Sequence, residues 1–389
     1  MATDIFTIKY SPVNLGTGKT DILFYESDSA QIVEEVLAST SQNTPRIFVT
    51  DTTVISLPLM KEFAKTFGVT NTTQIKKDCV FKCKTDVLAI LGSGERHKTI
   101  GNVLTIVKAA LDNGLQRSSL FVGIGGGVIC DMTAFAASVF KRGAKLELVP
   151  TTLLAMVDAA VGGKTGCDFG TYKNMLGTFY PASRIHVFSG FVQLLPESEY
   201  RSGLAETLKT AMLYAPKLFD TLQTQQDSVK KRSPEIVRQM VRRCVIAKAN
   251  IVEKDLTENG PRMQLNLGHT FGHALESIAG LGSIPHGDAV AWGIGRAMEL
   301  SLRLGLCEKE YRDEIFGVLQ SYGWETNPIH PVLDLPEQDK TQVVDSIIDA
   351  MKKDKKNDSD SIRCVLQRDI NSTVIQEVQE SDIKAVLEA

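Results

Sequence analysis

The pattern of hydrophobic residues changes near residue 190, and this change constrains the fold more than any other feature. Before it, short β-rich runs alternate with helical patterns, which predicts a parallel sheet covered by helices. The strand-like runs are 46–51, 87–91, 119–124 and 146–149, with helical patterns at 99–113 and 127–139. After it, helical patterns follow one another and strand-like runs nearly vanish, apart from 362–366. The helical patterns of this second half cover 203–214, 234–255, 262–279, 289–304, 308–322 and 340–353.

We therefore predict an α/β N-terminal domain over 1–190, with a Rossmann-like parallel sheet, and a mostly α-helical C-terminal domain over 191–389. A chain of 389 residues exceeds what one hydrophobic core usually organises, which also favours two domains. A ligand cleft is expected between the two domains.

The composition excludes several classes of protein. The chain is 43% hydrophobic and 23% charged with a net charge of −3, so nothing attracts it as a whole to nucleic acid or to an anionic membrane. Its seven cysteines are odd in number and spread thinly, which is typical of reduced thiols in a reducing compartment. The N-terminus shows no signal-peptide pattern, and no apolar run approaches the roughly 20 residues that span a bilayer. We predict a cytoplasmic protein that binds neither membrane nor nucleic acid.

Two histidines in a helical pattern are the first candidate for chemistry. His269 and His273 are four residues apart, so they lie on one face of a helix. Their surroundings are apolar, where an imidazole without partners is costly. Glu206 and His286 are further candidates from separate segments, and one carboxylate with two or three histidines suits a catalytic Zn²⁺ with an open position. The alternative is that the histidines belong to the core and have ordinary hydrogen-bond partners.

A glycine-rich turn in the first half suggests a phosphate-binding site. Gly125–Gly127 stand between a strand and a helix, where backbone N–H groups and the helix dipole favour an anion. The segment is not the dinucleotide fingerprint, because position 128 is valine, and a simple tight turn is the alternative. Asp51 ends another strand, at a position where a carboxylate binds ribose hydroxyls. A dinucleotide across the carboxyl ends of these strands is the prediction.

The segment 150–166 combines small residues with charged ones. Gly163, Lys164 and Thr165 are similar to the end of a P-loop, but position 158 is aspartate where that motif requires glycine, so a nucleoside triphosphatase is excluded. Lysines on glycine-rich loops suit an anionic substrate, whereas a solvated surface lysine is the alternative.

Nine segments together resemble the 3-dehydroquinate synthase family of sugar-phosphate cyclases. They follow the family's order over about residues 45 to 365, and the same superfamily includes metal-dependent glycerol and alcohol dehydrogenases. The segments are 94–98, 125–131, 141–143, 150–166, 173–177, 203–209, 262–276, 286–290 and 354–356.

The resemblance implies a role for each matching residue. It implies Glu206, His269 and His286 as ligands of Zn²⁺ or Co²⁺. It implies that His273 either transfers a proton or contacts the metal ligands without binding the metal itself. For NAD it implies Asp51, Glu95, Lys98, Gly126, Gly127, Asp131, Thr151, Thr152 and Lys173. For the substrate it implies Asp158, Lys164, Asn174, Lys209, Lys248, Arg262, Asn266 and either Lys355 or Lys356. Arg142 would reach the neighbouring subunit's site, which implies a homodimer.

The substrate of this family, 3-deoxy-D-arabino-heptulosonate 7-phosphate, carries a carboxylate and a phosphate. Arg262 and Lys248 are expected to hold the carboxylate, with the guanidinium as a bidentate donor. The expected phosphate ligands are Lys164, Asn174, Asn266 and a lysine of 354–356. The implied reaction is a lyase sequence of NAD-mediated oxidation, phosphate elimination, reduction, ring opening and aldol closure, with NAD⁺ regenerated each turn.

Some residues depart from the family's pattern, and they leave alternatives for the substrate. The departures are Cys130 for glycine, Ala159 and Ala160 for a serine pair, Ser198 for arginine, and Asp288 for glutamate. The alternatives are another cyclase that makes a C7 cyclitol, an NAD- and metal-dependent polyol dehydrogenase, and a non-catalytic NAD-binding module. Arg262 and Lys248 argue against a substrate without a carboxylate, because buried cations without an anionic partner are destabilising.

Overall fold

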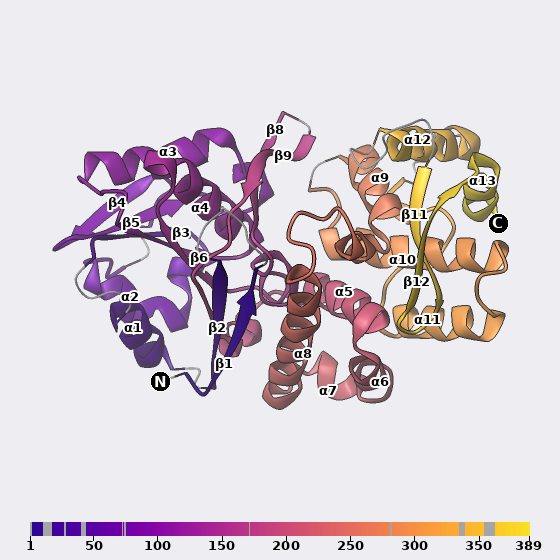
Figure 1. Cartoon of the computed structure of the whole chain (residues 1–389), viewed down its shortest axis with the longest axis horizontal. Coiled ribbons are helices and arrows are strands. Elements are labelled where there is room, and N and C mark those ends of the chain that lie inside the picture. Colours follow the sequence, from indigo (N-terminus) through magenta and orange to yellow (C-terminus); the bar gives the residue numbers. More distant parts are fainter. Residues whose placement is uncertain are drawn as a thin grey trace. The chain divides into compact units, whose positions relative to one another are not determined.

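The computed structural model divides into two compact units (Figure 1). Unit 1 comprises Met1–Pro196 and Lys248–Thr257, and unit 2 comprises Glu197–Ala247 and Glu258–Ala389. The change of unit at residue 196 falls close to the change of pattern at 190, whereas the return of the chain to unit 1 was not predicted. The structure describes residues 2–10, 18–26, 29–39, 44–71, 73, 75–170, 172–280, 282–333, 339–353 and 362–389.

Unit 1 is built on an eight-stranded sheet of order β1-β2-β10-β7-β6-β3-β5-β4. The six inner strands are parallel, and the edge strands β1 and β4 pair antiparallel with their neighbours. The strands are β1 Asp4–Lys9, β2 Lys19–Tyr25, β3 Arg46–Asp51, β4 Cys79–Cys83, β5 Asp86–Leu91, β6 Leu120–Gly125, β7 Lys145–Pro150 and β10 Arg184–Phe188. The predicted parallel α/β fold and its four predicted strands are confirmed. A separate antiparallel hairpin joins β8 Lys164–Phe169 to β9 Tyr172–Phe179.

Helices pack on this sheet because its inner strands are apolar on both faces. Every residue of β3 and β6 is buried, as expected of parallel strands covered on two sides. Thr99 begins α3 by accepting a hydrogen bond from the backbone N–H of Asn102, and α4 begins at Gly127 as predicted. The α-helices are α1 Ala30–Ser39, α2 Lys61–Thr66, α3 Ile100–Asp112 and α4 Gly127–Val139. Short turns are η1 Val54–Ser56, η2 Pro58–Met60, η4 Glu95–His97, η5 Phe140–Arg142, the π-helical η6 Ala155–Ala159 and η7 Ser189–Leu194.

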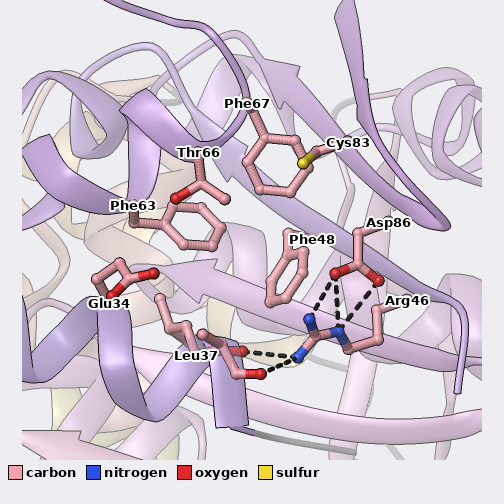
Figure 2. Close-up of a pocket in the computed structure, with 10 residues that line it drawn as sticks. Glu34, Leu37, Arg46, Phe48, Phe63, Thr66, Phe67, Cys83 and Asp86 are labelled. Carbon is pink, nitrogen blue, oxygen red and sulfur yellow. Dashed lines mark hydrogen bonds and ion pairs between the residues drawn. The ribbon is translucent and has the colours of Figure 1, made fainter. Parts of the chain in front are cut away.

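A small cavity of about 50 Å³ lies between α1, α2 and the sheet of unit 1 (Figure 2). Its walls are largely the rings of Phe48, Phe63 and Phe67, which pack edge to face or tilted. Beside them Arg46 makes a bidentate ion pair with Asp86. The same guanidinium donates to the carbonyls of Leu37 and Ala38 near the end of α1. The cavity contains none of the predicted site residues, and its polar groups serve the packing of α1.

Unit 2 is mainly helical, as predicted. Its helices are α5 Glu197–Tyr214, α6 Pro216–Thr224, α7 Gln226–Lys230, α8 Pro234–Val252, α9 His269–Ala279, α10 His286–Arg303, α11 Lys309–Ser321, α12 Lys340–Lys352 and α13 Glu380–Glu388, with short turns η8 Pro261–Asn266 and η9 Pro331–Leu333. The last residues of α8, from Lys248 onward, belong to unit 1. The central helix is α10, which packs against α5, α9, α11 and α13. The hairpin β11 Ile362–Asp369 and β12 Ser372–Val378 joins this core through buried Gln367, whose amide accepts from Tyr311 and donates to the Met212 carbonyl. Of the helices in the described residues, none is long and apolar enough to cross a membrane.

The predicted single helix over 262–279 is wrong in its first part. The chain forms the 3₁₀ turn η8, and the α-helix begins only at His269. Gly268 interrupts the helix because it adopts a left-handed conformation with φ of 79°. The apolar periodicity continues through this glycine, so periodicity alone gives no sign of the break.

Candidate active site

Three side chains predicted as metal ligands come from three helices of unit 2. Glu206 lies in the middle of α5, while His269 and His286 are the first residues of α9 and α10. A residue at the first position of a helix is held by the turn before it, which here contains Gly268 for α9 and Pro285 for α10. The fold therefore brings Glu206 together with His269 and His286, which lie 63 and 80 residues later in the sequence.

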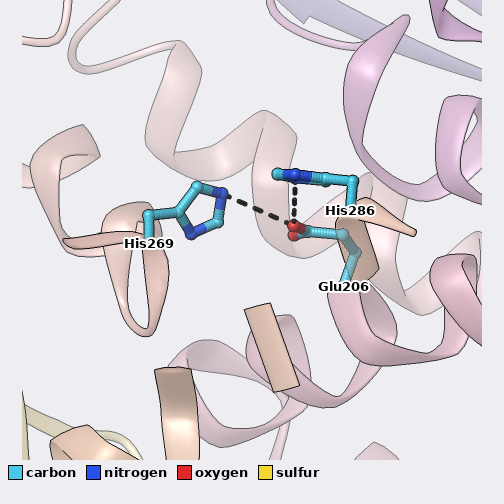
Figure 3. Close-up of side chains that lie close together, drawn as sticks. All are labelled: Glu206, His269 and His286. Carbon is cyan, nitrogen blue, oxygen red and sulfur yellow. Dashed lines mark ion pairs between the residues drawn. The ribbon is translucent and has the colours of Figure 1, made fainter. Parts of the chain in front are cut away.

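The three side chains form one donor group (Figure 3). One potential ligand atom from each lies within 4.8 Å of the others. Glu206 Oε1 is 3.5 Å from Nε2 of His269 and 3.5 Å from Nε2 of His286. The carboxylate is only 1% exposed, whereas the side chains of His269 and His286 are 12% and 31% exposed. A buried carboxylate with two imidazoles on one side is a donor set that suits a divalent metal with an open position.

The outer nitrogens of both histidines support this interpretation. Nδ1 of His269 lies 3.2 Å from the carbonyl of Leu267, and Nδ1 of His286 lies 3.3 Å from Glu276 Oε1. Acceptors at these positions favour a proton on each Nδ1, so each Nε2 presents its lone pair toward Glu206. The residues thus fit a metal ion in both donor type and tautomer. Burial disfavours a charged His286, but Glu206 and Glu276 raise its pKa to about 10, so these carboxylates favour positive charge here, either a proton on Nε2 or a cation that takes the place of that proton.

Glu276 is a site residue that the sequence analysis missed. It lies on α9, three residues after His273, and is buried. A carboxylate at i+3 from a histidine in an otherwise apolar helical face was the available signal.

His273 lies beside this group. Its ring centroid is 5.2 Å from that of His269 and 6.3 Å from that of His286. Within the described residues the donor group contains His269 and does not contain His273. The role of His273 stays a prediction.

The predicted substrate residues of unit 2 lie on α5 and in η8, which packs against α5. Lys209 forms an ion pair with Glu206 one turn earlier on α5, and both side chains are buried. Arg262, in η8, is 2% exposed and is among the largest fully buried side chains. Asn266 donates its amide to Glu258 at 2.8 Å. The predicted Lys355 and Lys356 lie outside the described residues.

The predicted cofactor residues of unit 1 gather at one edge of its sheet. Asp51 ends β3, Glu95 follows β5, Gly126 follows β6 and Thr151 follows β7. These four strands are neighbours and parallel, so their carboxyl ends meet at the same edge. Such an edge is where open α/β sheets bind dinucleotides. Burial raises the pKa of Asp51, although the N–H groups of Thr53 and Val54 and the hydroxyl of Ser93 counteract it.

The three glycines of the turn after β6 differ in how much space each has for a side chain. A Cβ on Gly125 would lie 2.5 Å from Ile129 Cβ, so this glycine is needed for packing of the turn itself. A Cβ on Gly126 or Gly127 would meet Thr152 at 3.1 Å or Ala159 at 3.3 Å, which is tight but less severe. The tight-turn explanation therefore accounts for Gly125 and leaves the other two available for a ligand. The hydroxyl of Thr152 accepts a hydrogen bond from the N–H of Ala155, the first residue of η6.

Lys98 joins predicted cofactor residues to a predicted substrate residue. Its Nζ lies 2.6 Å from Asp131 Oδ2 and 2.6 Å from Asn174 Oδ1, and the residue is 5% exposed. Burial would lower the pKa of Lys98, but the neighbouring Asp131 raises it, so the ammonium stays charged. Asn174 adopts a left-handed conformation with φ of 52°, and its N–H donates to Asp168. Asparagine is one of the few non-glycine residues that adopt this conformation readily.

The remaining predicted residues of unit 1 are distributed as follows. Lys248 Nζ lies 2.7 Å from the carbonyl of Asp158 and 2.8 Å from its carboxylate. Lys164 is exposed at the start of β8, and Lys173 is half-buried in β9. Arg142 ends η5 with φ of 65°, directly after another left-handed residue, and before Gly143.

Comparison with solved structures defines the class of protein. The fold is shared with a 2-epi-5-epi-valiolone synthase from Streptomyces hygroscopicus, solved with NAD⁺ and Zn²⁺ bound, at 25% identity and a TM-score of 0.79, covering 97% of this chain and 98% of that one. A 2-deoxy-scyllo-inosose synthase shares it at 22% identity and a TM-score of 0.77, covering 99% of both chains. A probable glycerol dehydrogenase from Sinorhizobium meliloti shares it at 13% identity and a TM-score of 0.59, covering 95% of both. The same fold is therefore found both in sugar-phosphate cyclases and in a probable dehydrogenase.

Sequence comparison narrows this class. Family models described as 3-dehydroquinate synthase N-terminal and C-terminal match residues 88–202 and 203–357. The 3-dehydroquinate synthase of Acidithiobacillus ferrooxidans is 39% identical over 308 residues, which cover 79% of this chain and 81% of that protein. That of Nostoc punctiforme is 38% identical over 302 residues, covering 77% and 80%. The chain belongs to the 3-dehydroquinate synthase family.

Proposed function

We propose that this protein is a lyase that converts 3-deoxy-D-arabino-heptulosonate 7-phosphate into 3-dehydroquinate and phosphate, a step of aromatic biosynthesis through shikimate. The observation that carries the proposal is the donor group of Glu206, His269 and His286, which lies inside the segments matched by the family models. A member of this family that has all three of these residues can bind the metal ion that the family's reaction uses.

Two groups from outside the chain complete the proposed site. Glu206, His269 and His286 hold Zn²⁺, with Co²⁺ as the alternative ion, and the carboxyl edge of the sheet in unit 1 holds NAD⁺. When bound, the metal supplies Lewis-acid polarisation of a substrate hydroxyl, and NAD⁺ takes up and returns a hydride. The related valiolone synthase, with NAD⁺ and Zn²⁺ bound, supports both assignments. The cofactor residues are Asp51, Glu95, Lys98, Gly126, Gly127, Asp131, Thr151, Thr152 and Lys173.

The chain's own residues bind and orient the substrate. Arg262 and Lys248 hold its carboxylate, and the bidentate guanidinium fixes the direction of the molecule. Lys209 reduces the negative charge of Glu206, with which it pairs. His273, beside His269, transfers a proton at the hydroxyl that is oxidised. Lys164, Asn174, Asn266 and a lysine at 355 or 356 bind the phosphate, while Asp158 aligns Lys248 through their ion pair.

Two charged residues favour this substrate over the alternatives. Arg262 and Lys248 are 2% and 5% exposed, and a guanidinium beside an ammonium is a combination that suits a ligand carboxylate. A C7 cyclitol precursor or a simple polyol lacks that carboxylate.

We also propose a cytoplasmic homodimer in which Arg142 serves the neighbouring subunit's site, with an NAD-binding domain at 1–190 and a metal and substrate domain at 191–389.

The test is incubation of the purified protein with NAD⁺, Zn²⁺ and the heptulosonate phosphate. We expect one phosphate released for each dehydroquinate formed, with no net NADH, because the hydride returns to the substrate. Stoichiometric NADH would instead support a polyol dehydrogenase. Absence of phosphate release from this substrate, with release from a sugar phosphate that lacks the carboxylate, would support the other cyclase.

A further inference from the structure

Two helices that carry metal ligands are joined by an ion pair close to those ligands. Arg201 of α5 approaches Asp288 of α10 in a bidentate manner, with Nε 3.0 Å from Oδ1 and Nη2 2.5 Å from Oδ2. The side chains are 34% and 13% exposed, so the carboxylate is largely shielded from water. Parallel charge-assisted hydrogen bonds of this kind fix orientation as well as distance.

A second hydrogen bond joins the same two helices, from a backbone N–H of α10 to a side-chain hydroxyl of α5. The N–H of Gly287 donates to the hydroxyl of Ser202 at 2.9 Å, and both groups are buried. A Cβ on Gly287 would lie 2.3 Å from the Cα of Ser202, so only glycine permits this approach. Together, Arg201–Asp288 and Ser202–Gly287 form what we call the α5–α10 clamp.

The position of this clamp gives it a consequence for the metal site. Ser202 precedes Glu206 by one helical turn, and the clamp's two residues on α10 directly follow His286. Glu206 and His286 contact each other at 3.5 Å between Oε1 and Nε2. A rotation or slide of α5 against α10 would change that distance first, because two of the three donors lie within a turn of the clamp.

We propose that Arg201 and Asp288 are positioning residues, which hold Glu206 and His286 at the separation that a metal ion requires and so set metal affinity. Neither residue touches the donor atoms themselves, and they act through the two helices. The inference rests on the metal site of the proposed function. Asp288 also stands in the first turn of α10, where the helix dipole favours a negative charge, so its carboxylate serves the helix start and the clamp together.

The chain contains a matched control at the far end of the same helix. Arg303 of α10 pairs with Asp382 of α13, with Nε 2.9 Å from Oδ1. This pair also joins α10 to a neighbouring helix through an arginine and an aspartate. It lies 17 residues from His286 along α10, counted from 286 to 303, and so away from the donor group.

The experiment measures zinc affinity of the metal-free protein by competition with a chromophoric chelator. We expect Arg201→Ala and Asp288→Asn to bind Zn²⁺ about 10- to 100-fold more weakly than wild type, the range found when a group that orients a ligand is removed. Arg201→Lys should fall between, because it keeps the charge and loses the bidentate geometry. Arg303→Ala should keep wild-type affinity. The melting temperature of each metal-free variant shows whether the loss comes from general unfolding.

Unchanged zinc affinity in Arg201→Ala and Asp288→Asn would overturn the inference. So would an equal loss in Arg303→Ala, or a loss that follows only the melting temperature of the metal-free protein, since both indicate a merely structural role. A wild type that binds no Zn²⁺ would remove the metal site and the inference with it. Phosphate release by the wild type is measured separately, so failure of the clamp leaves the proposed reaction standing.

Discussion

At the scale of single residues, Arg262 is the most informative position for substrate identity. It is 2% exposed, and a guanidinium so deeply buried is costly unless it has anionic or strongly polar partners. Under the proposed function its ligand is the substrate carboxylate. A neutral polyol offers no carboxylate to this guanidinium.

We predict that Arg262→Ala lowers kcat/KM for the heptulosonate phosphate by about 2–5 kcal/mol of transition-state binding, the size seen when one member of a buried charge pair is removed. Arg262→Lys should recover part of the loss, since an ammonium gives one point contact where a guanidinium gives two. Zinc and NAD⁺ binding should be unchanged. Steady-state kinetics with calorimetry would check this. Turnover near the wild-type value would mean that Arg262 does not bind the carboxylate, and a sugar phosphate without that group would become the better candidate.

Cys130, which stands where the family's pattern has glycine, should be chemically inert in the folded protein. It is fully buried in α4, and burial raises the pKa of its thiol above the usual range. We predict that iodoacetamide at pH 8 modifies the half-buried Cys79 and Cys83 but not Cys130, as peptide mass spectrometry would detect. Because the folded-state pKa is raised, this thiol's contribution to stability is lost as pH rises above about 8.5. Rapid labelling of Cys130 in the native protein would contradict its placement.

At the scale of helices, the glycines around the histidine motif serve close packing. A Cβ on Gly293 of α10 would lie 2.0 Å from the carbonyl of Gly268, and one on Gly272 of α9 would lie 2.9 Å from the carbonyl of Ala289. The two backbones therefore touch where α9 and α10 pack. This contact fixes His269 and His286 relative to each other in the same way as the α5–α10 clamp fixes Glu206 and His286.

We predict that Gly293→Ala destabilises the protein by about 1–3 kcal/mol, the usual cost of overpacking, and weakens zinc binding in the same variant. Gly317→Ala is the matched control. It lies in α11, and a Cβ there has no neighbour within 4 Å among the described residues. This control should stabilise by about 0.5–1 kcal/mol, because alanine is the better helix former. Denaturant unfolding of both variants would check the pair, and equal effects would refute the packing argument.

The elements that could be predicted from sequence are those with a strong and uninterrupted pattern. Strands such as β3 and β6 are buried on both faces, so they read as continuous apolar runs. The edge strand β4 alternates half-buried with exposed residues, and its partner is visible only in the fold. The break at Gly268 was missed because a left-handed glycine inside an apolar pattern looks like any other helical glycine.

Within the candidate site, residue types were predictable and partners were not. The donor group combines a motif on α9 with two residues from distant segments, and the family resemblance, rather than spacing, connected them. The contacts of Lys98 with Asn174 and of Arg201 with Asp288 join positions 76 and 87 residues apart. No local sequence pattern predicts such pairs, because they depend on strand order and on helix packing.

At the scale of the whole molecule, the proposed homodimer makes the site depend on two chains. Arg142 ends η5 in a left-handed conformation, next to Lys141, which is also left-handed. Two successive non-glycine residues in this region cost free energy, and such strain is typical of a segment shaped for function. The resemblance gives that function as contact with the neighbouring subunit's substrate.

This arrangement predicts recovery of activity between two inactive variants. Arg142→Ala and His269→Ala should each be inactive alone, the first lacking the residue given to its neighbour and the second lacking a metal ligand. In a mixed dimer, the Arg142→Ala subunit keeps its own His269 and receives an intact Arg142 from its partner, so one site of two is complete. Half of the dimers in an equal, randomly exchanged mixture are mixed, so activity should return to about one quarter of wild type. Phosphate-release assays on the exchanged mixture would check this value, and the mixed dimer isolated by co-expression with two affinity tags should reach about half of the wild-type activity, because every dimer then has one complete site. A mixed dimer as inactive as its parents would show that Arg142 acts within its own subunit, and a protein that stays monomeric at assay concentrations would exclude a shared site altogether.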